Sequence, residues 1–593
     1  MFAALMQSNT DSNGVVAQLR SLLRSLADSP ERRMILFLTV GIVVIICATA
    51  LGQIRLNIWQ GNFYDALEQK NISAFGRQLL VFFAIVGILL VLVVSQTLLH
   101  ELLKVRLREW LTRDLFDQWL VPGRAHRLQF AGEIGINPDQ RIQEDARHLT
   151  ELSAALSVGF LQAMLLLLGF LGVLWVLSAQ VVFVTSTGSF SIPGYMVWCA
   201  LAFALAGSWL TWRVGGPLIP LHNLRYSQEA ELRFALVRDS EYAEGIALYG
   251  GERDERRLLE QILDRLIDTM RQLAYRLTRL TWITSGHGWL SLVVPIIVAA
   301  PGYFGGSLSF GGLMMVAGAF YQVQQSLRWF VDNFAGIADW RATLARVMTF
   351  RNALLTLDEL HPDVPHIEIA SSPAGDLVLD NVGISLPEGS ATLDAAHIEV
   401  RPGERVLIVG GPHSGKTALV LALAGLWPWG TGRILVPPRE DVLFMYERPY
   451  LPLGTLRAAL TYPARPDRFD DAAVQSALQQ VGLDYLAPSL DRDARWDRLL
   501  SLDEQQLLAF ARLILHKPKW AFLDDALSAL EPPRRRQLMA LFEGPLAGTA
   551  VVSTSRTALS DHFFERTFTL RCGASGPCLP VHPRASQKHS QRA

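Results

Sequence analysis

Residues 410–417 read Gly-Gly-Pro-His-Ser-Gly-Lys-Thr, and this stretch decides the fold of the carboxyl-terminal part of the chain. The apolar run 406–409 before it is typical of a short buried strand, and the apolar run 418–426 after it is typical of a helix. A glycine-rich loop in this setting binds phosphate through main-chain N–H groups and the helix N-terminus. The predicted nucleotide contacts are Gly410, Gly411, Pro412, His413, Ser414, Gly415, Lys416 and Thr417. Lys416 is expected on the β- and γ-phosphates, and Thr417 on Mg²⁺.

A second apolar run, 520–524, reads Trp-Ala-Phe-Leu-Asp and predicts a strand that ends in a carboxylate. Asp524 is placed to hold Mg²⁺ through water. Asp525 follows directly, where a general base can orient an attacking water. Such a strand also occurs without any function, but together with the phosphate loop it indicates the second half of an ATP site.

The composition predicts a membrane protein with more than one domain. The chain has 593 residues, half of them hydrophobic, with a mean hydropathy of +0.24 and a net charge of −1. Nothing in this charge balance points to nucleic acid. The four cysteines show no metal-binding spacing, and two of them, Cys572 and Cys578, lie near the carboxyl terminus.

Four long stretches lack Asp, Glu, Lys and Arg: residues 34–54, 79–100, 152–212 and 280–327. About 20 apolar residues span a bilayer as a helix, so the first two stretches predict one span each and the last two predict two spans each. The six expected spans are 34–54, 79–100, 155–178, 195–216, 283–301 and 310–330. The long connections 101–151 and 217–279 are predicted as helices that continue past the bilayer, with a turn at 135–139.

Basic residues set the expected orientation. They cluster before the first span and after the second and fourth spans, which places both termini and both long connections in the cytoplasm. We expect a cytoplasmic segment 1–33, a membrane domain 34–355, a linker 356–366, an α/β nucleotide-binding domain 367–570 and a disordered tail 571–593. The expected fold class is a membrane α-helical bundle joined to a cytoplasmic α/β domain with a phosphate loop. A multi-pass protein of a bacterial cytoplasmic membrane fits this pattern.

Residues 500–505 read Leu-Ser-Leu-Asp-Glu-Gln and precede a predicted helix. They resemble the signature motif of ABC transporters, through which one subunit closes on the nucleotide of the other. Ser501 and Asp503 would then contact that nucleotide. Ser501 and Glu504 also form a capping-box pattern, which is a purely structural alternative, and both can hold together.

Further motifs narrow the resemblance. They are Asn-Pro-Asp-Gln-Arg-Ile at 137–142, the stretch 244–252, Gly-Leu-Trp-Pro-Trp-Gly at 425–430, the stretch 448–456, and residues 504–512. The chain resembles the SbmA/BacA-related ABC transporters with a fused ATPase, a group similar to the peroxisomal acyl-CoA half-transporters. The resemblance covers about residues 34–570. It implies an exporter-type fold, a homodimer, ATP and Mg²⁺ as cofactors, and a hydrophilic peptide-like or cofactor-like substrate.

The sequence departs from this family at the residues that sense and hydrolyse the nucleotide. Glu447 stands for the glutamine that binds Mg²⁺, Asp503 for a signature glycine, Asp525 for the catalytic glutamate and Ser555 for the switch histidine. In addition, Glu531 ends the motif that normally ends in Asp, and no aromatic residue lies between Phe350 and Trp427 to stack on adenine. We expect ATP to bind and to turn over slowly.

The sixth expected span contains unusual polar residues: Gln322, Gln324, Gln325, Arg328 and Asp332. Polar side chains in a span usually face a cavity or another helix. They could line the transport path, or they could hold helices together, with Arg328 and Asp332 as an ion pair. An ion-coupled transporter with a degenerate regulatory nucleotide domain is the alternative function. No Asp or Glu lies within the charge-free stretches, and this argues against proton coupling.

Overall fold

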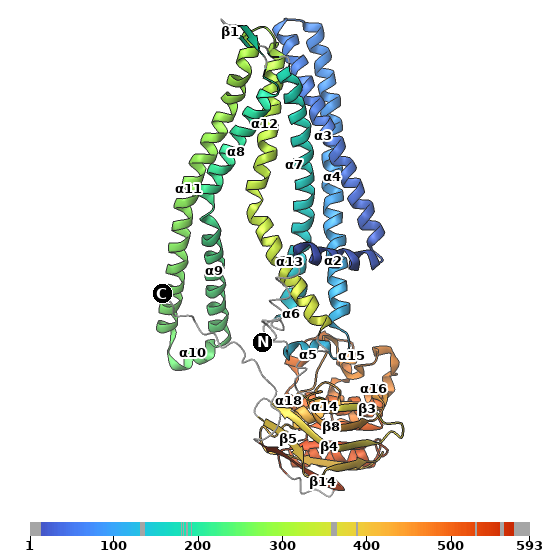
Figure 1. Ribbon diagram of the computed structural model, residues 1–593. Coiled ribbons are helices and arrows are strands. Elements are labelled where there is room, and N and C mark those ends of the chain that lie inside the picture. Colours follow the sequence, from blue (N-terminus) through green and yellow to red (C-terminus); the bar gives the residue numbers. More distant parts are fainter. Residues whose placement is uncertain are drawn as a thin grey trace. The chain divides into compact units, whose positions relative to one another are not determined.

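The computed structural model describes residues 14–130, 137–179, 181, 183–185, 188–190, 192–356, 365–386, 389–527, 531–557 and 563–573 (Figure 1). The chain forms two compact units. The membrane unit comprises Met1–Gln118 and Asn137–Asn352. The nucleotide unit comprises Trp119–Ile136 and Ala353–Ala593.

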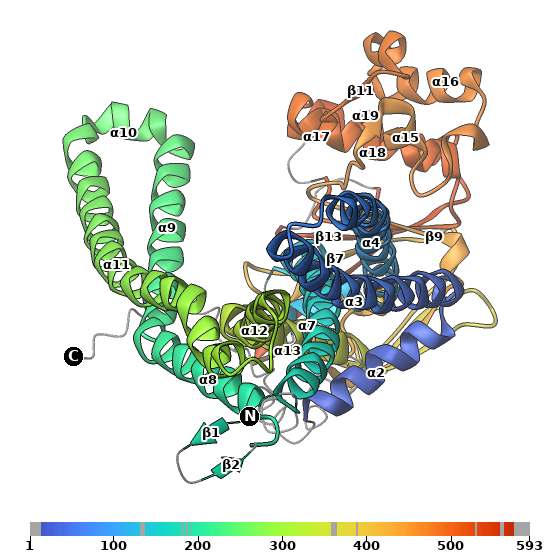
Figure 2. The same ribbon diagram turned by 90° about the horizontal axis from the view of Figure 1, so that it is seen from above.

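Long helices make up the membrane unit, together with a two-stranded hairpin of β1 (Phe183–Thr185) and β2 (Gly188–Phe190). The helices are α2 (Val15–Asp28), α3 (Arg32–Glu68), α4 (Ile72–Trp119), α6 (Pro138–Gln140), α7 (Ala146–Ala179), α8 (Tyr195–Gly215), α9 (Leu218–Glu241), α10 (Ala243–Tyr249), α11 (Glu252–Phe304), α12 (Phe310–Asp332) and α13 (Phe334–Leu355), with a π-helical stretch at Arg141–Asp145. The 53 residues of α11 extend about 80 Å at 1.5 Å per residue, far beyond a bilayer core of about 30 Å. The expected continuation of helices past the bilayer is therefore confirmed. Figures 1 and 2 show α9 and α11 side by side, joined by α10.

Five helical stretches of the described chain are long and apolar enough to cross a membrane: Arg32–Glu68, Ile72–Trp119, Pro138–Ala179, Tyr195–Glu241 and Glu252–Phe304. Each contains one expected span. The sixth expected span lies in α12, which is a helix of 23 residues whose glutamines lower its hydropathy. The count of six spans therefore stays a prediction.

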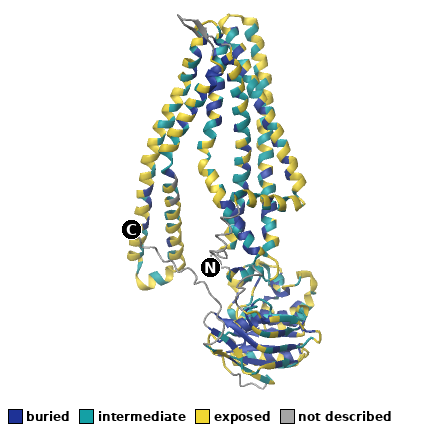
Figure 3. Ribbon diagram, viewed as in Figure 1, coloured by how far each residue is buried: buried dark blue, intermediate teal, exposed yellow. Residues whose placement is uncertain are grey.

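Helix α12 lies at the centre of the membrane unit and packs against α3, α7, α8 and α11 (Figure 2). Its contact with α3 is very close, because a Cβ atom built on Gly311 would lie 2.1 Å from the carbonyl oxygen of Gly61. Asp65 of α3 accepts a hydrogen bond from the Gly311 main-chain N–H at 2.7 Å and so caps the start of α12. In contrast, the most apolar window of α4 has no buried residue, as expected of a helix that faces lipid (Figure 3).

A sheet of ten strands forms the centre of the nucleotide unit, in the order β3-β8-β4-β5-β14-β7-β13-β12-β9, with β6 paired to β4. The strands are β3 (Glu368–Ser371), β4 (Leu377–Leu386), β5 (Gly389–Leu393), β6 (His397–Val400), β7 (Arg405–Val409), β8 (Gly430–Val436), β9 (Val442–Tyr446), β12 (Trp520–Asp524), β13 (Ala550–Ser555) and β14 (Arg566–Gly573). The neighbours from β14 to β9 run parallel, whereas β4 pairs antiparallel with β5, β6 and β8. The carboxyl ends of β7, β13 and β12 therefore meet at one edge, where ligands bind in α/β sheets.

Helices complete the nucleotide unit: α14 (Lys416–Leu423), α15 (Leu456–Thr461), α16 (Asp471–Val481), α17 (Trp496–Leu499), α18 (Leu502–His516) and α19 (Pro532–Ala540). A short pair, β10 (Gly454–Thr455) and β11 (Asp493–Ala494), lies beside α15. Every residue of α18 from Gln506 to Leu515 is buried, so this helix is part of the core. This agrees with its sequence, in which residues 507–515 are apolar except for Arg512.

The stretch Trp119–Ile136 belongs to the nucleotide unit although it lies between two helices of the membrane unit. Its described part contains α5 (Arg124–Arg127) and the 3₁₀ turn Leu128–Phe130. The Phe130 ring packs edge-on against the rings of Trp427 and Trp429, with centroid distances of 5.3 and 5.2 Å. Of the predicted turn at 135–139, Gly135 and Ile136 lie outside the described residues, and Asn137 with Pro138 begins helix α6 as expected.

Two expected boundaries differ from the structure. Strand β14 continues to Gly573, three residues past the end expected at 570, because Arg571, Cys572 and Gly573 pair with β5. The Gly/Ser/Pro composition beyond it had suggested an earlier end. The expected linker 356–366 falls within the nucleotide unit, whose second segment begins at Ala353, and His366 forms a bridge with Trp429. The remaining tail and most of the linker lie outside the described residues.

Candidate functional site

The loop 410–417 joins β7 to α14, as its sequence predicts. His413 and Gly415 have φ angles of 60° and 87°, in the left-handed region that closes the loop. A Cβ atom on Gly410 would lie 2.3 Å from Ser414 Oγ, so this position requires glycine. Lys416 Nζ donates hydrogen bonds to the carbonyl oxygens of Gly410 at 2.7 Å and Gly411 at 2.9 Å. The lysine is thereby held across the loop.

Asp524 ends β12 and points into the same space. Its residue is 5% exposed, and its Oδ1 accepts a hydrogen bond from Thr554 Oγ1 at 2.8 Å. Burial raises the pKa of Asp524, while hydrogen bonds from Thr554 and Thr417 act to lower it. Burial also lowers the pKa of Lys416, and the nearby carboxylates of Asp525 and Asp524 oppose that shift. The two groups thus form a partly desolvated site of opposite charges.

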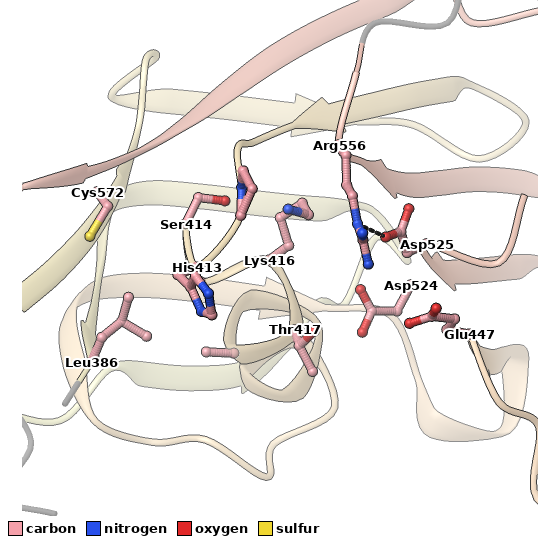
Figure 4. Close-up of a pocket in the computed structure, with 13 residues that line it drawn as sticks. Leu386, His413, Ser414, Lys416, Thr417, Glu447, Asp524, Asp525, Arg556 and Cys572 are labelled. Atoms are coloured by element: carbon pink, nitrogen blue, oxygen red, sulfur yellow. Dashed lines mark hydrogen bonds and ion pairs between the residues drawn. The ribbon is translucent and has the colours of Figure 1, made fainter. Parts of the chain in front are cut away.

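Asp525 follows with a φ angle of 51° and is 7% exposed. Its main-chain N–H donates to Thr554 Oγ1 at 3.1 Å, and its Oδ2 accepts from Arg556 Nε at 3.0 Å (Figure 4). The predicted base is therefore part of an ion pair. This pair was not predictable from sequence, because Asp525 follows β12 whereas Arg556 follows β13.

Of the two residues Ser555 and Glu447, only Glu447 lines the pocket. Ser555 is buried as the last residue of β13; its carbonyl accepts from the Gly410 N–H at 3.1 Å, and its Oγ accepts from the Thr557 N–H at 3.4 Å. It is not among the residues that line the pocket. Glu447 does line the pocket, and its main-chain carbonyl accepts a hydrogen bond from the Gln506 side chain.

These residues surround a pocket of about 910 Å³ (Figure 4). This volume suits a nucleotide-sized ligand. The lining residues are Leu386, Pro412, His413, Ser414, Gly415, Lys416, Thr417, Ala418, Glu447, Asp524, Asp525, Arg556 and Cys572. Leu386, Cys572 and Arg556 were not predicted from the sequence. Leu386 and Cys572 come from strands distant from the motifs, and Arg556, although it follows Ser555 directly, is not a motif residue. His366 forms a bridge with Trp429 and does not line this pocket.

The signature residues lie at the start of α18. Ser501 Oγ accepts from the Glu504 N–H at 3.3 Å, and Glu504 Oε2 accepts from the Ser501 N–H at 2.7 Å, which completes a capping box. The capping alternative is therefore confirmed. Tyr485 also donates a hydrogen bond to Glu504, and this bond lowers the pKa of that carboxyl. Ser501 and the exposed Asp503 do not line the pocket of their own chain.

The polar residues of α12 separate onto different faces. Gln324 is 6% exposed and, with Arg328 and His287, lines a small cavity of about 20 Å³ between α8, α11 and α12. That volume holds about one water molecule. Arg328 Nε donates to Asp332 Oδ2 at 3.2 Å, so the ion pair considered from the sequence is formed. Gln322, Gln325 and Asp332 do not line the cavity.

Comparisons with known proteins agree with both units. The family model described as ABC transporter transmembrane region 2 matches residues 22–304, and the family model described as ABC transporter matches residues 393–528. The inner membrane ABC transporter ATP-binding protein YddA of Escherichia coli is 31% identical over 520 residues, covering 87% of this chain and 91% of that protein. The chain belongs to the ABC transporter family.

Two further relatives belong to the D group of ABC transporters. The chloroplastic ABC transporter D family member 2 of Arabidopsis thaliana is 28% identical over 82% of this chain and 76% of its own length. The rat ATP-binding cassette sub-family D member 3 is 25% identical over 83% of this chain and 79% of its own length. The resemblance to ABC half-transporters is thereby confirmed. The link to the SbmA/BacA group stays a prediction.

A solved structure supports the fold of this ABC transporter. A bacterial Atm1-family ABC exporter with ATP bound has a TM-score of 0.66 at 16% identity, over 89% of this chain and 92% of that one. The expected exporter-type fold, a helical membrane part with an α/β phosphate-loop domain, is confirmed. Membership of this family implies that the chain uses ATP.

Proposed function

We propose that two copies of the chain form a transporter that moves a hydrophilic, peptide-like or cofactor-like solute across the bacterial cytoplasmic membrane. Closure of the two nucleotide units around ATP would drive the movement. The observation that carries this proposal is the pocket in which Lys416, Thr417, Asp524 and Asp525 meet at the carboxyl ends of the central strands. The name of the Escherichia coli relative, an inner membrane protein, supports the location.

Mg²⁺ fits the residues of this pocket. In the described part of the chain, no three His, Cys, Asp or Glu residues cluster as a metal cage. Mg²⁺ seldom needs such a cage, because it keeps several waters and binds one or two carboxylates together with the phosphates of its nucleotide. Asp524, Glu447 and the Thr417 hydroxyl supply that donor set. When bound, Mg²⁺ would neutralise charge on the phosphates.

We infer that this site hydrolyses ATP slowly. A general base must lie within hydrogen-bond reach of the attacking water, and Asp525 is shorter than the glutamate of the family and is paired with Arg556. Ser555 has no charge to offer and is not among the residues that line the pocket. Asp503 adds a negative charge at the signature helix. Binding residues are complete, whereas those for hydrolysis are altered.

Transport by the reconstituted protein tests this proposal. The full-length protein in liposomes is supplied with a labelled hydrophilic peptide or labelled cobalamin, with Mg-ATP, without nucleotide, or with a proton gradient alone. Uptake that requires Mg-ATP and is lost in Lys416→Ala is expected. Uptake driven by the proton gradient alone, and unchanged in Lys416→Ala, would instead establish the ion-coupled alternative.

The ATPase rate of the same preparation tests the second inference. Lys416→Ala provides the blank. We expect turnover well below about 1 s⁻¹, the lower end of ordinary enzyme rates. A rate at or above this value contradicts impaired hydrolysis without affecting the transport proposal.

A further inference from the structure

Arg556 is the feature of the nucleotide pocket that the family motifs leave unassigned. It follows Ser555 at the end of β13, and its side chain, 63% exposed, lines the pocket beside Asp525 (Figure 4). Its Nε donates to Asp525 Oδ2 at 3.0 Å. A guanidinium carries five N–H donors, so this bond leaves several donors for another acceptor.

We propose that Arg556 binds the γ-phosphate of the nucleotide, and that Asp525 holds the arginine in place until a nucleoside triphosphate enters. This inference rests on the proposed function only in that the pocket binds ATP. It deepens that proposal by naming the residue that distinguishes ATP from ADP.

The position of Ser555 favours this assignment. Its carbonyl is bonded to the phosphate loop through Gly410, and its hydroxyl accepts from Thr557. The serine is buried in the sheet, is not among the residues that line the pocket, and carries no charge to offer a phosphate. Arg556 is the next residue along the chain, and it emerges at the pocket with a permanent positive charge.

The charges in the pocket lead to the same conclusion. Glu447, Asp524 and Asp525 are three carboxylates, and Lys416 and Arg556 are the strongly basic side chains among the described lining residues. Lys416 already donates to two carbonyl oxygens of its own loop. Mg²⁺, when bound, would offset the charges of Asp524 and Glu447, but Asp525 would still repel the terminal phosphate. An arginine between Asp525 and that phosphate reduces this repulsion, and its planar fork suits phosphate oxygens.

The pair with Asp525 makes the contact selective. Asp525 is anchored by its main-chain bond to Thr554, so it stays at the floor of the pocket. A diphosphate leaves the guanidinium on Asp525. A triphosphate brings oxygen acceptors to the exposed side of the guanidinium, which can then bridge carboxylate and phosphate. ATP should therefore gain from Arg556, and ADP should not.

The test is competition binding on the full-length protein in detergent, with Mg²⁺ and a fluorescent ATP analogue displaced by ATP or by ADP. In Arg556→Ala we expect ATP affinity to fall about tenfold, the effect of one charge-assisted contact, while ADP affinity changes less than about twofold. Arg556→Lys should keep part of the ATP preference. Arg401→Ala, which removes an exposed arginine paired with Glu399 outside the pocket, should change neither affinity.

A second background separates direct contact from an effect through Asp525. In Asp525→Asn, adding Arg556→Ala should still reduce ATP affinity, because the arginine contacts phosphate. If the loss disappears in this background, Arg556 acts only by neutralising Asp525 and the proposal is wrong. Equal losses for ATP and ADP, or no loss for either, would also overturn it. None of these results bears on whether ATP drives uptake, which the transport experiment decides separately.

Discussion

The hydroxyl of Thr554 donates a hydrogen bond to the carboxylate of Asp524 at 2.8 Å, across the parallel pair β12 and β13. The same hydroxyl accepts the main-chain N–H of Asp525. One threonine therefore orients both acidic residues at the end of the central strand. Thr554 lies on β13, and Ser555 and Arg556 follow it directly in the chain.

Thr554→Val should weaken Mg²⁺-dependent nucleotide binding and shift it to higher pH. Burial raises the pKa of Asp524 and the Thr554 bond opposes this shift, so its loss raises the pKa further. Because the metal needs the ionised carboxylate, affinity at neutral pH should fall about three- to tenfold, the effect of one hydrogen bond. Nucleotide binding measured between pH 5 and pH 8 checks this, with Thr554→Ser as a control that keeps the hydroxyl. Identical pH profiles for Val and wild type would contradict it.

Ser501→Ala should lower the free energy of unfolding by about 1 kcal/mol, because helix α18 loses its N-cap. The capping box formed with Glu504 is the reason. Urea unfolding of the full-length protein followed by far-UV circular dichroism measures the change. Ser476→Ala, in the exposed middle of α16, should stay within about 0.5 kcal/mol of wild type. A loss of equal size in both variants would show that the cap is not its cause.

Phe130→Ala should destabilise the nucleotide unit and alter its tryptophan fluorescence. The Phe130 ring packs edge-on against the buried Trp427 and Trp429. Because Phe130 is only half-buried, truncating its side chain should cost about 1–2 kcal/mol, less than for a fully buried Phe. Thermal unfolding with tryptophan emission as the readout tests both effects. Phe130→Leu should keep most of the stability but lose the aromatic contact, and an unchanged emission spectrum in Phe130→Ala would refute the packing.

His516→Gln should make the nucleotide unit less sensitive to acid. Burial lowers the pKa of His516 below 6.5, with Arg468 and Arg512 adding to the shift and the bond to the Thr461 carbonyl opposing it. The unfolded chain therefore binds the proton first, and stability is lost as the pH falls below about 6.5 toward the folded pKa. The fall in Tm from pH 7.5 to pH 5.5 should be smaller in the variant. Parallel falls in the two proteins would count against this histidine.

Gly311→Ala should destabilise the membrane unit strongly, since the added Cβ would meet the Gly61 carbonyl and the Asp65 side chain. Overpacking of this kind costs about 1–3 kcal/mol, and backbone contact leaves little room to relax. Gly87→Ala is a matched control, because a Cβ at Gly87 meets nothing within 4 Å. Thermal inactivation in detergent compares them. Equal melting of the two variants would mean that α3 and α12 are not in close contact.

Local sequence patterns were sufficient for the elements and motifs of this protein. The strand at 406–409 and the glycine-rich loop were predictable because both depend on neighbouring residues, and β7 and α14 confirm them. The long charge-free runs predicted helices for the same reason. Which polar residues of α12 are buried was not predicted. Gln324 is buried and Gln325 is exposed, because successive residues of a helix are rotated by about 100°.

Tertiary pairings could not be predicted in this way. Arg556 and Asp525 lie on neighbouring strands that are 31 residues apart in sequence, and no motif links them. Leu386 and Cys572 reach the pocket from β4 and β14, whose side chains give no local sign of this role. Strand β14 was given too early an end, because its last residues are stabilised by pairing with β5 and not by their own composition.

Because Trp119–Ile136 belongs to the nucleotide unit, the protein cannot be cut into two intact units at a single point in the chain. A fragment that starts at Ala353 contains every ATP-binding motif yet lacks Phe130, so it leaves the aromatic surface of Trp427 and Trp429 uncovered. Exchanging the ATP-binding half with that of a relative would break the same contact unless the donor's loop travels with it. The stretch Trp119–Ile136 should therefore stay with the ATP-binding half in any fragment or chimaera.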